Sequence, residues 1–196
     1  DLPEPFVKLD TTTGEPENVT RSRKDPGIRK AYNLVEEMML LANETVAADL
    51  AARKVPAIYR VHGLPDEHRL EQFAGLARAL GYNLDEEEAT DPKQLSKFLQ
   101  TLEDAPHKSA LSYLLLRAMQ QASYDTVNVG HFGLAAPHYL HFTSPIRRYP
   151  DTAVHRVVRK LARDEPIDVT GLERKLQEQA RTSIKKAAPF MRGICM

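Results

Sequence analysis

The chain has 196 residues, of which 42% are hydrophobic, and its 27 Lys and Arg residues balance 27 Asp and Glu residues. This composition is sufficient for one domain with a packed core, or for a large part of one, and it excludes a strongly basic or strongly acidic protein. The single cysteine, Cys195, excludes an internal disulfide framework and a CxxC metal site, and it fits a reducing, cytoplasmic location. No apolar run approaches about 18 residues, so we expect no membrane span.

The balanced net charge hides a separation of charge along the sequence. Residues 143–196 contain 12 Lys or Arg and 6 Asp or Glu, a net charge of +6, so residues 1–142 carry −6. This asymmetry favours an anionic ligand near the C-terminal third, although like-charged solvated helix faces are also common.

The N-terminal part combines a strand, a turn and a long helix. The pattern predicts a strand over residues 4–10, a turn over 11–16 and a basic connector over 21–30. A helix follows from about Ile28 to Arg53, and its apolar residues recur at helical spacing. Because this apolar stripe is wide, we expect the helix to be well buried. The stripe consists of Leu34, Val35, Met38, Met39, Leu41, Ala42 and Val46.

The middle of the chain predicts short elements separated by clear helix signals. Glycine commonly follows a helix end, and Asp followed by Pro is a helix start signal. In chain order we expect a strand at 57–62, a helix ending at Gly81, a solvated acidic loop at 85–88, a helix starting at Asp91-Pro92, a helix at 107–122 and an extended, Gly-punctuated segment at 128–136.

The C-terminal third is predicted to be helical. Ser144 is a natural N-cap and Pro145 a natural first helical residue, so a helix is expected to start there, and a last helix is expected over 171–191. The few short strands cannot form a stable sheet alone. We therefore predict an α+β fold that is mostly helical, with strands that belong to a larger sheet or barrel.

The segment from Tyr139 to Asp151, which leads into His155-Arg156, is the most informative part of the sequence. It contains the adjacent arginines Arg147 and Arg148 between two prolines. Guanidinium groups bind phosphate in a bidentate manner, so the segment predicts a phosphate clamp. Adjacent helical residues point about 100° apart, so one arginine would clamp a phosphate while the other braces the backbone or pairs with an acid. The alternative is an ordinary surface pair.

Two other arrangements of polar residues are possible. His138-x-x-His141 could suggest zinc, but it has no cysteine partner and no HExxH pattern accompanies it, so we expect no metal ligands within the chain. Ser144, His155 and Asp151 could form a catalytic triad, but no nucleophile elbow positions the serine.

Polar residues also lie on the long helix and on the strand that follows it. Glu36 and Glu37 are ordinary helix residues, and Asn43 could face inward to bind a backbone group or a ligand. On the strand, Arg60 and His62 lie on one face, which suits either the lining of a groove or a solvent face.

Taken together, four separated segments resemble the catalytic (RNB) domain of the RNase II and RNase R family, and more specifically its C-terminal half. They are 31–43 (AYNLVEEMMLLAN), 56–62 (PAIYRVH), 130–135 (GHFGLA) and 139–151 (YLHFTSPIRRYPD) with His155-Arg156. Their order and spacing suit the family over nearly the whole chain.

The resemblance implies a 3′-to-5′ hydrolytic exoribonuclease that threads single-stranded RNA through a basic channel and releases nucleoside 5′-monophosphates. It implies Mg²⁺ held by aspartates, and an arginine, here Arg147, that stabilises charge on the scissile phosphate. The helix with Glu36 and Glu37 resembles one that senses the ribose 2′-hydroxyl. The RNA-binding residues we expect are Glu36, Glu37, Asn43, Arg60, His62, His141, Ser144, Arg148, Tyr149 and Arg156.

The sequence also departs from the family pattern. The aspartate cluster, the cold-shock domains and the S1 domain are absent, and residues 177–180 and 184–190 match the family poorly. We therefore expect residues 1–196 to be the C-terminal part of a single RNB domain, inactive alone, with Mg²⁺ ligands upstream in the missing N-terminal half. The alternatives are a non-catalytic RNA-binding protein with a degenerate RNB fold and, more weakly, a helical interaction module.

Overall fold

The computed structural model describes residues 5–21, 25–102, 105–178 and 180. The chain divides into two compact units, residues 1–40 and 41–196, and each is described by itself. The predicted last helix is described only over residues 169–178 and at 180, so the rest of it lies outside the described residues. None of the helices in these ranges combines the length and apolar composition needed to cross a bilayer.

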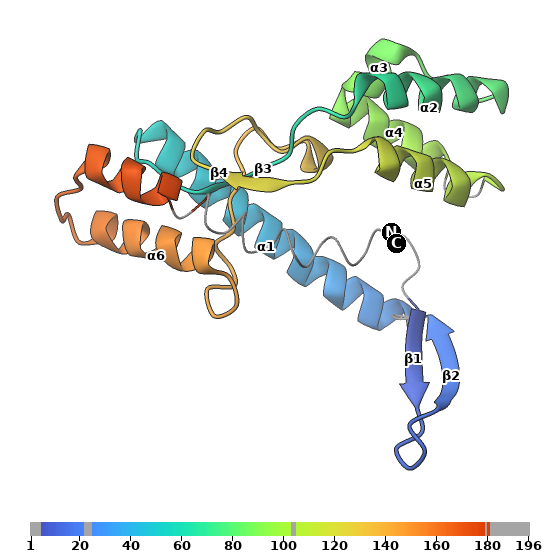
Figure 1. Cartoon of the computed structure of the whole chain (residues 1–196), viewed down its shortest axis with the longest axis horizontal. Coiled ribbons are helices and arrows are strands. Elements are labelled where there is room, and N and C mark those ends of the chain that lie inside the picture. Colours follow the sequence, from blue (N-terminus) through green and yellow to red (C-terminus); the bar gives the residue numbers. More distant parts are fainter. Residues whose placement is uncertain (1–4, 22–24, 103–104, 179, 181–196) are drawn as a thin grey trace. The chain divides into compact units, whose positions relative to one another are not determined.

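The first unit contains a β-hairpin, labelled in Figure 1. Strand β1 (Pro5–Leu9) pairs antiparallel with β2 (Pro16–Arg21), with a bulge at Lys8/Leu9. In the turn, the Asp10 carboxylate accepts hydrogen bonds from the backbone N–H groups of Thr12 and Thr13, and these bonds lower the pKa of Asp10. The predicted first strand and turn are confirmed. The second strand was missed because its sequence, PENVTR, has weak strand propensity.

Helix α1 (Pro26–Ala52) runs from the first unit into the second and matches the predicted range to within two residues. The prediction that the helix is well buried is wrong. Its buried residues are Asn43, Ala47 and Leu50, all near its C-terminal end. Helical periodicity reports an apolar face, but it does not report whether a partner covers that face. The large apolar residues left exposed include Leu34 at 63%, Val35 at 54%, Met38 at 63% and Leu41 at 67%.

A small antiparallel sheet lies at the centre of the second unit (Figure 1). Strand β3 (Tyr59–Val61) pairs with β4 (Ser123–Asp125), and single bridges add Leu140 beside Tyr59 and His131 beside His62. The sheet thereby joins three parts of the chain that are far apart in sequence. Its buried neighbours from α1, β3 and helix α6 (Tyr149–Ala162) form one core: Ala47, Leu50, Ala57, Tyr59, Val61, Leu140, Val154 and Val157.

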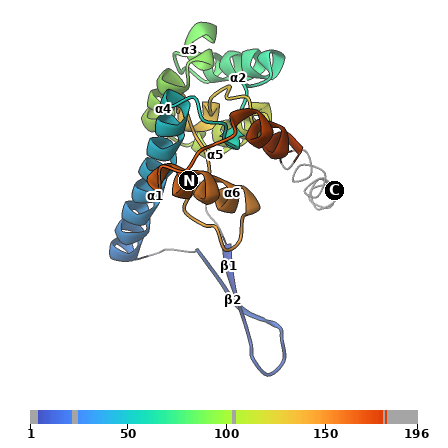
Figure 2. The ribbon, with the colours of Figure 1, turned by 90° about the vertical axis from the view of Figure 1, so that its left-hand side faces the viewer.

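Four helices form a second core, and they gather as one group in both Figure 1 and Figure 2. The helices are α2 (Glu67–Ala79), α3 (Glu86–Thr90), α4 (Pro92–Thr101) and α5 (Lys108–Ala118). Phe73 and Phe98 meet edge to face at 6.1 Å within this core. The buried apolar residues of α2, α4 and α5 therefore have partners, in contrast to the apolar residues near the start of α1.

The helix signals of this group have mixed outcomes. Asp91 accepts a backbone N–H at the start of α4 and Gly81 adopts φ +86° after α2, as predicted, and Asp66 caps the start of α2 in the same way. The predicted loop at 85–88 is wrong, because these residues begin α3, where the Asp85 N–H donates to the Glu88 carboxylate. Helix α5 ends at Ala118 rather than at 122, because the chain turns into β4 at Ser123.

The predicted helix start at Ser144 is also wrong. Residues 144–148, which we call the arginine turn, form a turn in which the backbone N–H groups of Arg147 and Arg148 both donate to the Ser144 carbonyl. Helix α6 begins at Tyr149. A helix starting at Pro145 would place Pro150 in its interior, where the proline ring clashes with the preceding turn. Starting at Tyr149 places Pro150 in the first turn, where its missing N–H costs nothing.

Candidate functional site

The arginine turn is fixed to α6 by one buried carboxylate. Asp151 is fully buried, and its Oδ2 accepts the Ser144 backbone N–H at 2.8 Å. The same oxygen lies 3.2 Å from Nε and 3.0 Å from Nη2 of Arg148. Two hydrogen bonds to this oxygen, from the Ser144 N–H and from Nε of Arg148, hold both ends of the turn, because Ser144 opens it and Arg148 closes it. The Arg148 side chain therefore braces the turn from within.

The Arg147 side chain has the opposite environment. It is exposed, and among the described residues its guanidinium has no ion-pair or hydrogen-bond partner. Ile146 beside it is also fully exposed, and Tyr149 is 46% exposed. The turn therefore presents a free guanidinium on a backbone that Asp151 holds in place. A guanidinium in this setting can bind a phosphate without first breaking an internal ion pair.

Asn43 connects α1 to the segment before the arginine turn. Its Nδ2 donates to the Tyr139 hydroxyl at 3.1 Å, and its Oδ1 accepts the Phe142 backbone N–H at 2.9 Å. Asn43 is only 3% exposed. The sequence left open whether this amide faces a backbone group or a ligand, and in the structure it binds the Phe142 backbone and positions residues 139–142.

His62 has a similar internal role. Its Nε2 lies 2.7 Å from the Gln120 carbonyl, and its Nδ1 accepts the Gly133 backbone N–H at 2.9 Å. Because a carbonyl only accepts, Nε2 carries the proton. Both ring nitrogens are occupied by backbone groups, so His62 links β3 to the segment around Gly133 rather than presenting a free nitrogen.

Aromatic side chains extend from the arginine turn to β3. The Tyr124 hydroxyl lies 2.7 Å from Nδ1 of His141, and the Arg60 guanidinium lies 4.8 Å from the centre of the Tyr124 ring. Burial lowers the pKa of His141 to about 4, and the charge of Arg148 adds to this effect. Burial likewise raises the pKa of Tyr124. Both groups are therefore neutral near pH 7. We refer to Asn43, Tyr124, His141, Arg148 and Asp151 as the polar cluster.

Tyr124 and Asp151 were not among the residues that sequence reasoning selected for the site. Tyr124 follows from the pairing of β4 with β3, which brings together residues more than 60 positions apart and leaves no local pattern. Asp151 had a usable signal, since it follows Arg148 at the i,i+3 spacing that allows an ion pair within a helical turn.

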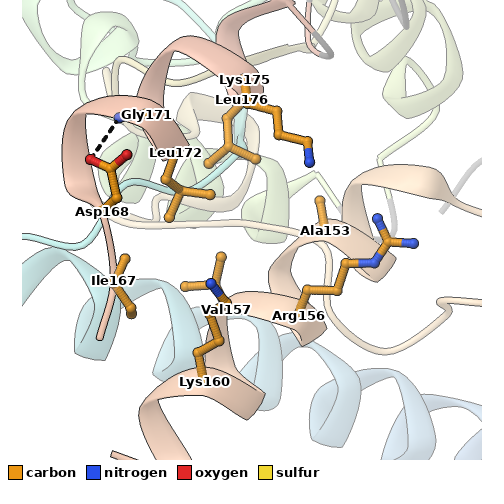
Figure 3. Close-up of a pocket in the computed structure, with 10 residues that line it drawn as sticks. All are labelled: Ala153, Arg156, Val157, Lys160, Ile167, Asp168, Gly171, Leu172, Lys175 and Leu176. Carbon is orange, nitrogen blue, oxygen red and sulfur yellow. Dashed lines mark hydrogen bonds between the residues drawn. The ribbon is translucent and has the colours of Figure 1, made fainter. Parts of the chain in front are cut away.

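The remaining predicted residues fall into separate places. Ser144 contributes its backbone N–H to Asp151. Glu36 and Glu37 are exposed residues of the first unit, whereas the contacts above lie within the second. Arg156 lines a groove of about 270 Å³ between α6 and residues 169–178, shown in Figure 3.

The alternative chemistries do not assemble. The His155 Nε2 donates to the Phe142 carbonyl at 2.7 Å, and its ring stacks on Phe142 at 4.0 Å, so it is not paired with Ser144 as a triad requires. In the described part of the chain, no three His, Cys, Asp or Glu side chains are placed to hold a metal ion.

Comparison with known proteins gives consistent matches. The family model of the RNB domain matches residues 1–164. The ribonuclease R of Aquifex aeolicus is 43% identical over 168 residues, which cover 86% of this chain and 23% of that protein. The structure of Mycoplasma genitalium RNase R in complex with ribose-methylated single-stranded RNA matches with a TM-score of 0.78 and 29% identity, over 93% of this chain and 28% of that one.

A protein described as a pseudonuclease also matches. Yeast Ssd1 is similar with a TM-score of 0.65 and 28% identity, over 75% of this chain and 19% of that one. This chain therefore spans between 19% and 28% of the length of these proteins.

Proposed function

The chain belongs to the RNB domain family of RNase II and RNase R, and from this premise we propose that it is the C-terminal part of a catalytic domain that hydrolyses single-stranded RNA from its 3′ end. The products would be nucleoside 5′-monophosphates. The observation that carries this proposal is the free Arg147 guanidinium on a turn fixed by the buried Asp151 carboxylate. The proposed partners are the RNA and the N-terminal half of the domain, and the proposed compartment is the cytoplasm.

Arg147 would act on the scissile phosphate. Its charge is permanent, and its planar donors match two phosphate oxygens. A donor held in place before the reaction stabilises the charge that develops in the transition state without a cost of reorganisation. The hydrogen bonds of Ser144 and Arg148 to Asp151 supply this fixed position.

The other predicted contacts support this role in two ways. Arg60, His141 and Tyr149 are proposed to line the path of the RNA, since they lie beside the polar cluster or are exposed at the arginine turn. Asn43 and His62 act through the backbone segments that they hold. Glu36 and Glu37 remain proposed contacts to the ribose 2′-hydroxyl.

The described residues do not fit the magnesium site that the family implies. Asp151 is the one fully buried carboxylate among them, and its charge is already paired with Arg148. No cluster of acids accompanies it in these ranges. We propose that the magnesium ligands lie in the N-terminal half of the domain, and no step is assigned to a metal on the residues described.

A chimeric enzyme tests the proposal. The matching 168 residues of the Aquifex aeolicus ribonuclease R would be replaced by this chain, and the release of mononucleotides from a uniformly labelled single-stranded RNA would be measured with Mg²⁺. We expect the chimera to release mononucleotides and the isolated chain to release none. A chimera that folds and binds RNA but releases nothing would refute the proposed role, and efficient release by the isolated chain would refute the need for upstream ligands.

The second candidate is an RNA-binding protein that has lost catalysis, and the match to the pseudonuclease Ssd1 favours keeping it. The residues upstream of Asp1 discriminate between the two. Closely spaced aspartates there indicate an enzyme, and their substitution indicates a binding protein. An interaction module without RNA affinity would instead show binding that is negligible and insensitive to salt.

A further inference from the structure

The groove beside Arg156 is separate from the arginine turn. The groove lies between α6 and residues 169–178. Figure 3 shows α6 on one side of the groove and Lys175 extending over the groove from the other side. Cations stand at its rim and aliphatic side chains form its floor. The rim carries Arg156, Lys160 and Lys175, and the floor consists of Ala153, Val157, Ile167, Leu172 and Leu176.

The three rim cations are unpaired. Within the described ranges, Arg156, Lys160 and Lys175 have no ion pair, whereas Arg148 pairs with Asp151 and Arg163 lies 3.8 Å from Glu165. Arg156 and Lys160 are one helical turn apart and so lie on the same edge of α6.

The acidic residue of the lining does not cancel these charges. Asp168 is the one carboxylate among the lining residues, and its Oδ1 accepts the Gly171 backbone N–H at 3.1 Å, as Figure 3 shows. It thus serves the first turn of helical residues 169–178. The groove keeps a surplus of positive charge above an apolar floor.

We propose that this groove is a second RNA contact, which holds a nucleotide of a single-stranded RNA with the base on the aliphatic floor and the adjoining phosphates at the three cations. The inference rests on the proposed function, since it assumes that the chain acts on RNA. Helix α6 begins directly after the arginine turn, so Arg156 lies about 10 Å further along the helix axis. An RNA bound at Arg147 therefore needs few nucleotides to reach the groove beside Arg156.

The size and charge of the groove favour a nucleotide over a protein segment. A cavity of about 270 Å³ lies at the lower end of ligand pockets, near 300 Å³, and an amphipathic helix needs a longer groove for its successive anchors. Residues 181–196 cannot supply the complementary charge, because they contain four Lys or Arg and no Asp or Glu. No aromatic ring lines the groove, so we expect binding with little base preference.

The test compares two triple variants of this chain with equal changes of charge. The groove variant is Arg156→Gln, Lys160→Gln and Lys175→Gln. The control variant is Arg159→Gln, Arg163→Gln and Arg174→Gln, which removes exposed cations outside the groove from α6, from the residue that follows α6 and from residues 169–178. Binding of a fluorescent 12-nucleotide oligouridylate would be measured by anisotropy between 50 and 200 mM salt, and circular dichroism would verify folding.

We expect the groove variant to bind roughly tenfold more weakly and to lower the slope of log K against log salt by about 2, since each phosphate contact on a single strand contributes about 0.7. The control should change affinity by less than about twofold. Equal losses in the two variants, or none in either, would overturn the proposal. The proposal would also be overturned if an acidic peptide displaced the RNA while the groove variant bound RNA as tightly as the unchanged chain.

Photo-crosslinking gives a second measurement that needs no variant. An RNA containing 4-thiouridine should crosslink to peptides from α6 or from residues 169–178, and crosslinks confined to other parts of the chain would contradict the proposal. The Arg147→Ala chimera separates the two hypotheses. If only the groove hypothesis is wrong, Arg147→Ala still lowers turnover. If the proposed function is wrong, RNA still binds in the groove but no mononucleotide is released.

Discussion

The polar cluster and the groove beside Arg156 use charge in opposite ways. In the polar cluster, Arg148 is bound to a fully buried carboxylate, so its charge fixes the backbone. In the groove, Arg156, Lys160 and Lys175 are unpaired among the described residues, so their charges are available to a ligand. A cation with an internal partner fixes the position of the backbone, and a cation without one is available to bind a ligand. Substitutions in the polar cluster should therefore lower stability, whereas substitutions in the groove should lower RNA affinity.

Loss of the Asp151 carboxylate should have the largest effect on stability. Asp151→Ala leaves the partly buried Arg148 without its partner and removes the acceptor of the Ser144 N–H. We expect a loss of about 3–5 kcal/mol in the free energy of unfolding, measured by urea denaturation of this chain. Arg147→Ala is the matched control and should change stability by less than about 0.5 kcal/mol, because its side chain is exposed. Similar losses in both variants would contradict the division of roles.

Loss of the Arg147 guanidinium should act on turnover. In the chimeric enzyme, Arg147→Ala is expected to lower kcat by about 10²–10³, because it removes a donor aimed at charge that develops in the transition state. The RNA dissociation constant should change little. Rapid-quench measurement of mononucleotide release gives the rate, and Arg159→Ala serves as a surface control. Equal losses of rate and affinity would instead assign Arg147 to anchoring.

Loss of the Asn43 amide should have an intermediate effect. Asn43→Ala leaves the Phe142 N–H and the Tyr139 hydroxyl without their partner in a buried setting. We expect a loss of about 1–3 kcal/mol in the free energy of unfolding. Thr45→Ala, on the exposed side of the same helix, should cost much less. Equal costs would show that the link to residues 139–142 contributes little.

A pH dependence of stability is also expected from His141 and His131. Burial lowers the pKa of each to about 4, below the ordinary value of 6.5. The unfolded chain therefore binds more protons between about pH 6.5 and 4, so stability should rise with pH across that window and stay level above it. Urea midpoints at pH 5 and pH 7 would measure the rise, and His141→Gln should reduce it. A rise that His141→Gln leaves unchanged would place its origin elsewhere.

Local signals in the sequence predicted much of the fold. The start of α4, the end of α2 and the extent of α1 follow from capping residues and helical periodicity. The pairing of β4 with β3 could not be predicted, because three residues carry no periodicity and their partner lies more than 60 positions away. The start of α6 depended on competition between two signals, in which the position of Pro150 outweighed the capping preference of Ser144.

The candidate site was only partly visible in the sequence. The adjacent arginines indicated a division of roles, but the assignment of bracing to Arg148 required the position of Asp151. Asn43 and His62 were selected as ligand contacts because polar residues on a helix or strand face give no sign of an internal partner. In the structure their partners are backbone groups and a hydroxyl far away in the sequence.

The hydrogen bonds of Asn43 also bear on the order of folding. They join residues 96 and 99 positions apart, whereas the contacts of Asp151 span 3 and 7 positions. Closing a long loop costs more chain entropy than closing a short one, so contacts of high sequence separation form slowly. We expect the arginine turn to form early and the link to α1 to form late. In a partly folded chain the clamp would then exist before residues 139–142 are held in place.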